Sequence, residues 1–232
     1  MGPNIGLATL DTDGWVQDIT HRLAVPTDIG GKILPRIAVI HYSGSGTAES
    51  AISWLTRRDD IYVSAHFVIA RNGTITQIVP IFRKAYHAGR SVWKTVENVN
   101  NRSIGIELAN WGRLLSAESH GISQGPFGCY SYTGQHVPDV DVVWATHKHE
   151  QVITPWEKYT DAQLHVCAWL ISSIRATVPT LGEIVGHDDV APGRKSDPGP
   201  AFDMHWLRVA VFEPEKLPDI EKERAAKIKA TT

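Results

Sequence analysis

Two histidines and one aspartate have the chemistry of a catalytic metal site. His41 ends a short apolar run, His187 lies in the sequence GHDD, and Asp197 lies in the sequence KSDPG. A catalytic zinc ion is typically held by three His, Asp or Glu side chains, and water takes its fourth position. Because the two histidines lie far apart in the chain, only the fold can bring them together. Spacing alone therefore leaves a structural role open for each of them.

Short strands are expected to position these side chains. Residues 36–41 (RIAVIH) are nearly continuously apolar and are followed by a Ser/Gly-rich turn, which predicts a buried strand ending at His41. Residues 103–109 (SIGIELA) alternate, so Glu107 is expected on the face opposite the apolar residues. Another short strand is predicted over 183–186, directly before His187.

The other elements follow from local signals. Thr47 can cap a helix that runs to about Arg57. Strand-like runs over 65–70 and 74–79 flank an Asn-Gly step, which predicts a hairpin. A capping box formed by Thr160 and Gln163 precedes apolar residues at helical spacing. Residues 111–155 are irregular, and we expect an insertion of loops with a short hairpin.

Composition indicates one ordinary soluble domain. The chain has 232 residues, of which 42% are hydrophobic and 21% are charged, enough for a sizeable core. A net charge of −2 argues against nucleic acid or an anionic membrane as a partner. Cys129 and Cys167 form no disulfide framework. The N-terminus lacks the features of a signal peptide, so we expect a protein that is cytoplasmic as synthesised.

We expect three parts along the chain. Residues 1–32 form an N-terminal extension, residues 33–212 a single α/β domain with the insertion at about 111–155, and residues 213–232 a charged C-terminal tail. We expect a monomer.

Five sequence blocks resemble, in order, the motifs of one enzyme family. They are VIHYS (39–43), SAHFVIARNGTITQIVP (64–80), AYHAG (85–89), SIGIELAN (103–110) and GHDDVAPGRKSDPGPAF (186–202), of which the last is the most specific. The chain is thereby similar to the zinc-dependent N-acetylmuramoyl-L-alanine amidases of type 2, which share their fold with the peptidoglycan recognition proteins. The resemblance implies a mixed central β-sheet flanked by helices.

The resemblance also implies roles for individual residues. His41, His187 and Asp197 would ligate one zinc ion, Glu107 would act as general base on the attacking water, and Lys195 would stabilise the oxyanion. His87 would contact the substrate, which would be peptidoglycan or a muropeptide cleaved between N-acetylmuramic acid and L-alanine. Tyr42 directly follows His41, so we expect it either to contact the substrate or to pack beside the buried strand. The physical chemistry agrees, because general acid–base help typically accelerates reactions about 10²–10⁴-fold and a lysine stabilises charge that develops in the transition state.

Alternatives remain at this point. Some phage members of the family have a tyrosine before the second-block histidine and a cysteine as third ligand, where this chain has Ala65 and Asp197. The same fold also serves as a non-catalytic peptidoglycan-binding module, and a zinc hydrolase of this fold could cleave another amide. The sequence does not decide between a phage lysin acting on the intact wall and a recycling enzyme acting on soluble anhydro-muropeptides.

The remaining candidates are expected to be structural. His66 starts an apolar run and is expected to be a hydrogen-bonded core residue, whereas His147 and His149 are expected to be exposed. Cys167 lies on the apolar stripe of the predicted 164–174 helix and is expected in the core. Trp93, Trp111 and Trp144 could stack on sugar rings, but ordinary packing explains them equally well.

Overall fold

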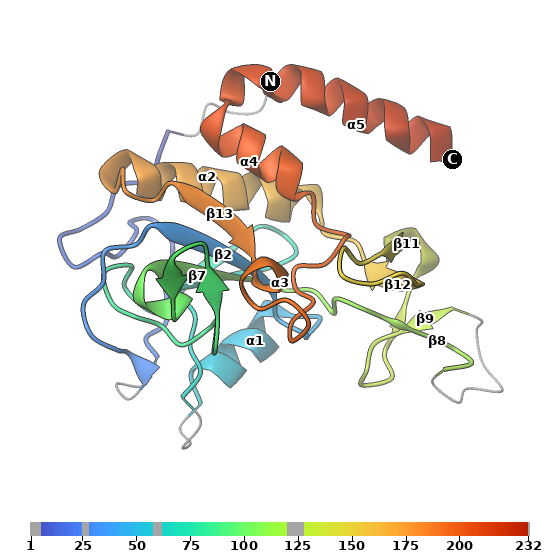
Figure 1. Cartoon of the computed structure of the whole chain (residues 1–232), viewed down its shortest axis with the longest axis horizontal. Helices are drawn as coiled ribbons and strands as arrows, with labels where there is room; N and C mark the ends of the chain where they lie inside the picture. Colours follow the sequence, from blue (N-terminus) through green and yellow to red (C-terminus); the bar gives the residue numbers. More distant parts are fainter. Residues whose placement is uncertain (1–5, 25–27, 58–61, 120–127, 232) are drawn as a thin grey trace.

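A mixed six-stranded sheet forms the centre of the molecule. The computed structural model describes residues 6–24, 28–57, 62–119 and 128–231. The strands are ordered β1-β4-β3-β7-β2-β13, of which β7, β2 and β13 are labelled in Figure 1. They are β1 (Thr20–His21), β2 (Ile37–Tyr42), β3 (Phe67–Ile69), β4 (Ile75–Gln77), β7 (Ser103–Leu108) and β13 (Glu183–Gly186). Neighbouring strands run parallel except β3 and β4, which form the predicted hairpin. Gly73 in its turn has a φ of +87°, which a glycine adopts without strain.

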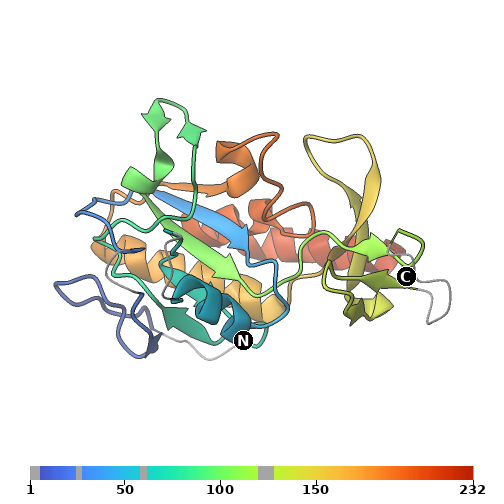
Figure 2. The same ribbon diagram turned by 90° about the horizontal axis from the view of Figure 1, so that it is seen from below.

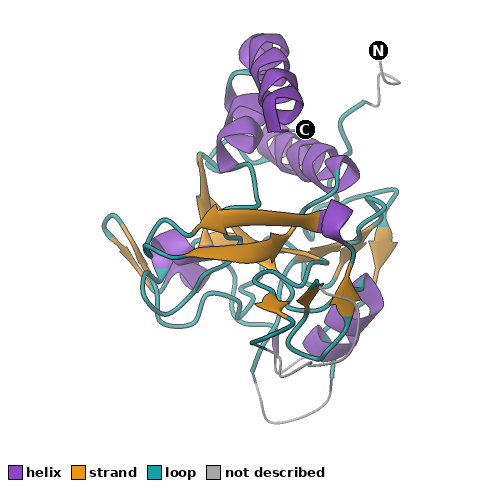
Figure 3. Cartoon of the chain, turned by 90° about the vertical axis from the view of Figure 1, so that its right-hand side faces the viewer, coloured by secondary structure: helices purple, strands orange, loops and turns teal. Residues whose placement is uncertain are grey.

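Helices cover both faces of the sheet. α2 (Asp161–Thr177), α4 (Met204–Phe212) and α5 (Leu217–Thr231) lie on one side, and α1 (Ala48–Leu55) lies on the other (Figures 1 and 3). The short α3 (His187–Val190) follows β13, and β5 (Val92–Trp93) pairs with β6 (Val96–Glu97). Within the described ranges, no helix is both long and apolar enough to span a membrane. The predicted fold class, a mixed sheet flanked by helices, is confirmed.

Alternation along the central strands separates core from site. Ile104 and Ile106 of β7 pack with Ile40 of β2 in the core cluster that includes α2, and each of the three is fully buried. Burial of each such side chain contributes about 1.5–3 kcal/mol to folding. The intervening residues face the other side of the sheet, as the alternation predicts, so Glu107 and His41 lie on the side of α1.

Both predicted helix caps are present. The Thr47 hydroxyl accepts a hydrogen bond from the Ser50 N–H at the start of α1 (3.2 Å). At the start of α2, the Thr160 hydroxyl accepts from the Gln163 N–H, and the Gln163 side chain accepts from the Thr160 N–H, both at 3.1 Å. Cys167 in α2 is fully buried in the core, as expected.

Residues 111–157, which we call the arm, project from the sheet between β7 and α2 (Figures 1 and 2). The arm holds a three-stranded sheet of β8 (Leu115–Ser116), β9 (Cys129–Tyr130) and β10 (His136–Val137), and a ribbon of β11 (Val142–Thr146) and β12 (Ile153–Glu157). Residues 120–127 of the predicted insertion lie outside the described residues. The arm is more regular than expected. Its strands were not predicted from the sequence because two-residue strands show no alternation and Pro155 interrupts the strand signal in β12.

Candidate metal centre

The candidate site lies where three neighbouring parallel strands end. His41 is near the end of β2 and is paired in register with Glu107 of β7. His187 directly follows β13, whose last residue, Gly186, is paired with Ile40. The carboxyl ends of parallel strands meet at one edge of a sheet, where α/β proteins place their sites. The topology therefore joins side chains that are far apart in the sequence.

A loop after α3 brings Asp197 to the same edge. The Asp188 N–H donates to the Asp197 carbonyl at 2.8 Å and ties the loop to the start of α3. Gly186 permits this approach, because a Cβ there would lie 2.2 Å from the Asp188 carboxylate and 2.7 Å from Pro198. The GHDD and KSDPG blocks thus form one unit around the end of β13.

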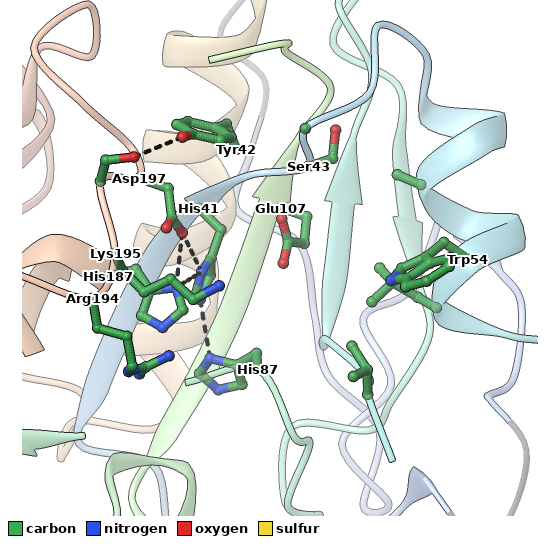
Figure 4. Close-up of a pocket in the computed structure, with 15 residues that line it drawn as sticks. His41, Tyr42, Ser43, Trp54, His87, Glu107, His187, Arg194, Lys195 and Asp197 are labelled. Carbon is green, nitrogen blue, oxygen red and sulfur yellow. Dashed lines mark hydrogen bonds and ion pairs between the residues drawn. The ribbon is translucent and has the colours of Figure 1, made fainter. Parts of the chain in front are cut away.

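Three ligand atoms form a compact triangle in the site. The Nδ1 atoms of His41 and His187 are 3.0 Å apart, and the Asp197 Oδ2 atom is 2.8 Å from the first and 2.9 Å from the second. All three side chains are buried and turned toward one another (Figure 4). Among the described residues, these three side chains form a group of His and Asp residues that could hold a metal ion.

Hydrogen bonds behind the triangle assign the ring tautomers. His187 Nε2 donates to the Ala88 carbonyl at 3.1 Å, so its Nδ1 presents a lone pair to the triangle. His41 Nε2 donates to His87 Nδ1 (3.0 Å), and His87 Nε2 donates to the Ser103 hydroxyl (3.2 Å). The Ser103 hydroxyl in turn donates to the Val99 carbonyl at 2.8 Å. Such outer hydrogen bonds orient metal-binding histidines.

The donor set fits a zinc ion. Burial and the neighbouring His187 lower the pKa of His41 to about 4, so its ring is neutral at pH 7. Burial alone would raise the pKa of the Asp197 carboxyl, but the imidazoles of His187 and His41 bring it below its usual range. Two imidazole lone pairs and a carboxylate oxygen then converge in a buried site, where a bound cation would offset their mutual repulsion. Two nitrogens and one oxygen are a typical catalytic zinc set.

Glu107 and Lys195 line the same cavity as the triangle. The cavity has a volume of about 410 Å³. Burial and the nearby negative charge of Asp197 raise the pKa of Glu107 well above its ordinary value, and Lys195 acts in the opposite direction. Neither side chain has a hydrogen-bond or ion-pair partner among the described residues. Both are therefore available to a molecule bound in the cavity (Figure 4).

The other predicted contacts also lie at the cavity. His87 is buried behind His41 and reaches the cavity wall with its ring. Tyr42 lines the cavity, and its hydroxyl lies 2.8 Å from the Ser196 hydroxyl. Contact of His87 and Tyr42 with substrate stays a prediction. His66 is a buried core residue whose two ring nitrogens are both hydrogen-bonded, as expected.

The expectation that His147 is exposed is wrong. His147 is 2% exposed, and its Nε2 donates to the Asp188 carboxylate at 3.0 Å. This partner lies next to His187, forty-one positions along the chain, so no local pattern reveals it. His149 is exposed, as expected, and its Nε2 donates to the Asp188 carbonyl.

The sequence reasoning missed Trp54 at the cavity. Trp54 lies on α1, is 57% exposed and lines the cavity, whereas none of Trp93, Trp111 and Trp144 does. The signal was available, because Trp54 falls between the apolar residues of the predicted helix without belonging to its buried stripe.

Among the described residues, the structure is that of an α/β protein with a candidate metal-ligand cluster at the carboxyl edge of a mixed sheet. Residues 31–200 match the N-acetylmuramoyl-L-alanine amidase model (Amidase_2). The chain belongs to this family.

Individual relatives agree with this assignment. The chain is 33% identical over 150 residues to the 1,6-anhydro-N-acetylmuramyl-L-alanine amidase AmpD of Escherichia coli, a match that covers 64% of this chain and 58% of that relative. The crystal structure of a selenomethionine AmpD derivative superposes with a TM-score of 0.61 at 26% identity, covering 87% of this chain and 98% of that one.

A second solved structure shows the same fold. It is the amidase AmiD from Escherichia coli in complex with anhydro-N-acetylmuramic acid-L-Ala-D-γ-Glu-L-Lys, with a TM-score of 0.56 and 24% identity. The match covers 88% of this chain and 65% of AmiD.

Proposed function

We propose that the protein hydrolyses the amide bond between the lactyl group of N-acetylmuramic acid and the L-alanine of a peptidoglycan stem peptide. The observation that carries the proposal is the convergence of a buried His-His-Asp triangle, Glu107 and Lys195 on one cavity. Membership of the amidase family supports the choice of bond. The presence of all five side chains argues against a binding module without activity.

His41, His187 and Asp197 would hold the zinc ion. When bound, zinc would supply Lewis acidity, which polarises a carbonyl and lowers the pKa of water toward 7. The rest of the chemistry falls to side chains of this chain. The hydrogen bonds from His41 to His87 and from His187 to the Ala88 carbonyl keep both Nδ1 atoms unprotonated and aimed into the site.

Glu107 would move the proton. Its raised pKa brings the carboxylate closer to the range in which a general base works well at neutral pH. The carboxylate would accept a proton from the attacking water and deliver it to the amine nitrogen as the carbon–nitrogen bond breaks. The Lys195 ammonium would stabilise the negative charge that develops on the amide oxygen, an interaction strongest in the transition state.

The test is hydrolysis of two substrates, intact sacculi and a soluble anhydro-muropeptide, followed by mass spectrometry. We expect new N-terminal L-alanine without new reducing sugar, loss of activity with a chelator, and recovery on adding zinc. Glu107→Gln should lower kcat about 10²–10⁴-fold while zinc content stays stoichiometric. Glu97→Gln is the matched control, because Glu97 is exposed and lies outside the cavity.

The outcomes separate the alternatives. Stoichiometric zinc without cleavage of either substrate would favour a binding module, and cleavage of free peptides instead would indicate another amide as substrate. Preference for the soluble fragment would match the substrate in the name of the AmpD relative. Preference for sacculi would indicate a wall-degrading role.

A further inference from the structure

A second cavity lies between the arm and the loop that carries Lys195. We propose that this cavity, lined by Arg113, Tyr132 and His149 of the arm and by Arg194, Lys195 and Ser196 of the loop, binds a carboxylate of the stem peptide. The inference rests on the proposed function and names the part of the substrate that the arm recognises.

The second cavity adjoins the candidate metal centre. Its volume is about 370 Å³, and Tyr42, Arg194, Lys195 and Ser196 line both cavities. A molecule whose amide lies beside the metal ligands can therefore extend past the Tyr42–Ser196 hydrogen bond toward the arm. The candidate site is thus extended by a second cavity, whose arm residues lie outside the five sequence blocks.

Contacts with the metal-ligand unit fix the arm as a wall of this cavity. His147 donates to the Asp188 carboxylate at 3.0 Å, and the Lys148 ammonium lies 2.8 Å from the same carboxylate. Lys148 also pairs with Asp189, and His149 donates to the Asp188 carbonyl at 3.0 Å. Three consecutive arm residues therefore contact the segment that follows His187. The cavity is preformed by these contacts.

The charge of the cavity favours an anion. Arg113, Arg194 and Lys195 line it together with a single acidic residue, Glu150. Arg113 pairs with Glu150 at 2.6 Å, and Arg194 donates to the carbonyls of Ala88 and Arg90. Lys195 has no ion-pair partner among the described residues. Arg194 and Lys195 therefore have no carboxylate partner among the described residues.

The chemistry of the substrate indicates which side of the cleaved amide bond occupies the second cavity. On the acyl side of the bond, the lactyl carboxyl is consumed in the amide and the N-acetyl sugar is uncharged. On the amine side, the stem peptide retains carboxylates. The compound bound to AmiD illustrates this, since a γ-linked glutamate leaves its α-carboxylate free. A cationic cavity therefore complements the peptide side.

Two variants that break the same ion pair test this assignment in the full-length chain. Isothermal calorimetry would measure binding of N-acetyl-L-Ala-D-Glu and of its neutral diamide. Arg113→Gln should weaken binding of the acid about tenfold, since a hydrogen bond to a charged group is lost. Glu150→Gln should strengthen it several-fold, because it removes the competing carboxylate. The diamide should bind all variants alike, and Asp139→Asn, which removes an exposed arm carboxylate outside the cavity, should leave both ligands unaffected.

The opposite signs separate binding from structural damage. If both variants weaken binding, or if the acid and the diamide change together, the ion pair is structural and the inference is wrong. Hydrolysis of muropeptide by the unaltered protein without any charge-dependent binding would overturn this inference alone. Charge-dependent peptide binding without hydrolysis would overturn the proposed function and leave the cavity's preference standing.

Discussion

His66 should make the protein lose stability on acidification, and a single substitution at this residue can measure its contribution. Its Nε2 donates to the Arg83 carbonyl (2.9 Å), and its Nδ1 accepts from the Gly105 N–H (3.0 Å). Only the neutral ring can do both. Burial lowers the pKa of His66 from 6.5 to about 4. Because the folded-state pKa lies below the unfolded one, this contribution is present above pH 6.5 and is lost as the pH falls toward 4.

The size of the effect follows from the shift. A difference of this size between folded and unfolded states corresponds to about 3 kcal/mol between pH 7 and pH 4. Urea unfolding at steps between these pH values would compare the unaltered protein with His66→Gln, whose side chain does not titrate. We expect His66→Gln to be less stable at pH 7 and to lose about 3 kcal/mol less on acidification.

The comparison cancels the titrating groups that do not interact with His66. His87, whose ring centroid lies 5.8 Å from that of His66, remains in both proteins, but the charge on a protonated His66 lowers the pKa of His87 only in the unaltered protein. Parallel stability curves from pH 7 to pH 4 would refute the reasoning, because they would show that His66 binds a proton equally well in the folded and unfolded chain.

Two further substitutions probe how the site and the sheet are held. In Gly105→Ala the new Cβ would lie 2.4 Å from the His87 ring. We therefore expect thermal unfolding to show a stability loss of about 1–3 kcal/mol, and competition with a chelator to show weaker zinc binding. Gly31→Ala is the control, because nothing lies within 4 Å of a Cβ at that position. Thr160→Ala should cost about 1 kcal/mol in chemical denaturation because α2 loses its capping box, and a change confined to enzyme activity would contradict that account.

The elements that position the candidate metal ligands could be predicted because their signals are local. The apolar run before His41, the alternation around Glu107 and the capping box at Thr160 each depend on neighbours a few residues away. The predicted family is confirmed, and the blocks that hold His41, Glu107 and His187 lie at the strand ends that form the candidate site. The expected monomer and the cytoplasmic origin stay predictions.

What could not be predicted depends on partners distant in the sequence. The burial of His147 follows from Asp188, and the hydrogen bond from His41 to His87 depends on the close approach that Gly105 permits. The strands of the arm could not be predicted from the sequence because they are short and show little alternation of apolar and polar residues. Each of these features is created by the tertiary structure.

The arm begins and ends at almost the same place. At its base, the Glu157 N–H donates to the Gly112 carbonyl and the Leu114 N–H donates to the Pro155 carbonyl. The Asn110 side chain donates to the Glu157 and Lys158 carbonyls, which closes the stem. Because these hydrogen bonds already join the end of β7 to the start of α2, a change in the length of the arm need not alter the register of the strands that carry the candidate metal ligands. If the arm binds the stem peptide as proposed, a change in the arm alters substrate choice while the candidate metal centre stays intact.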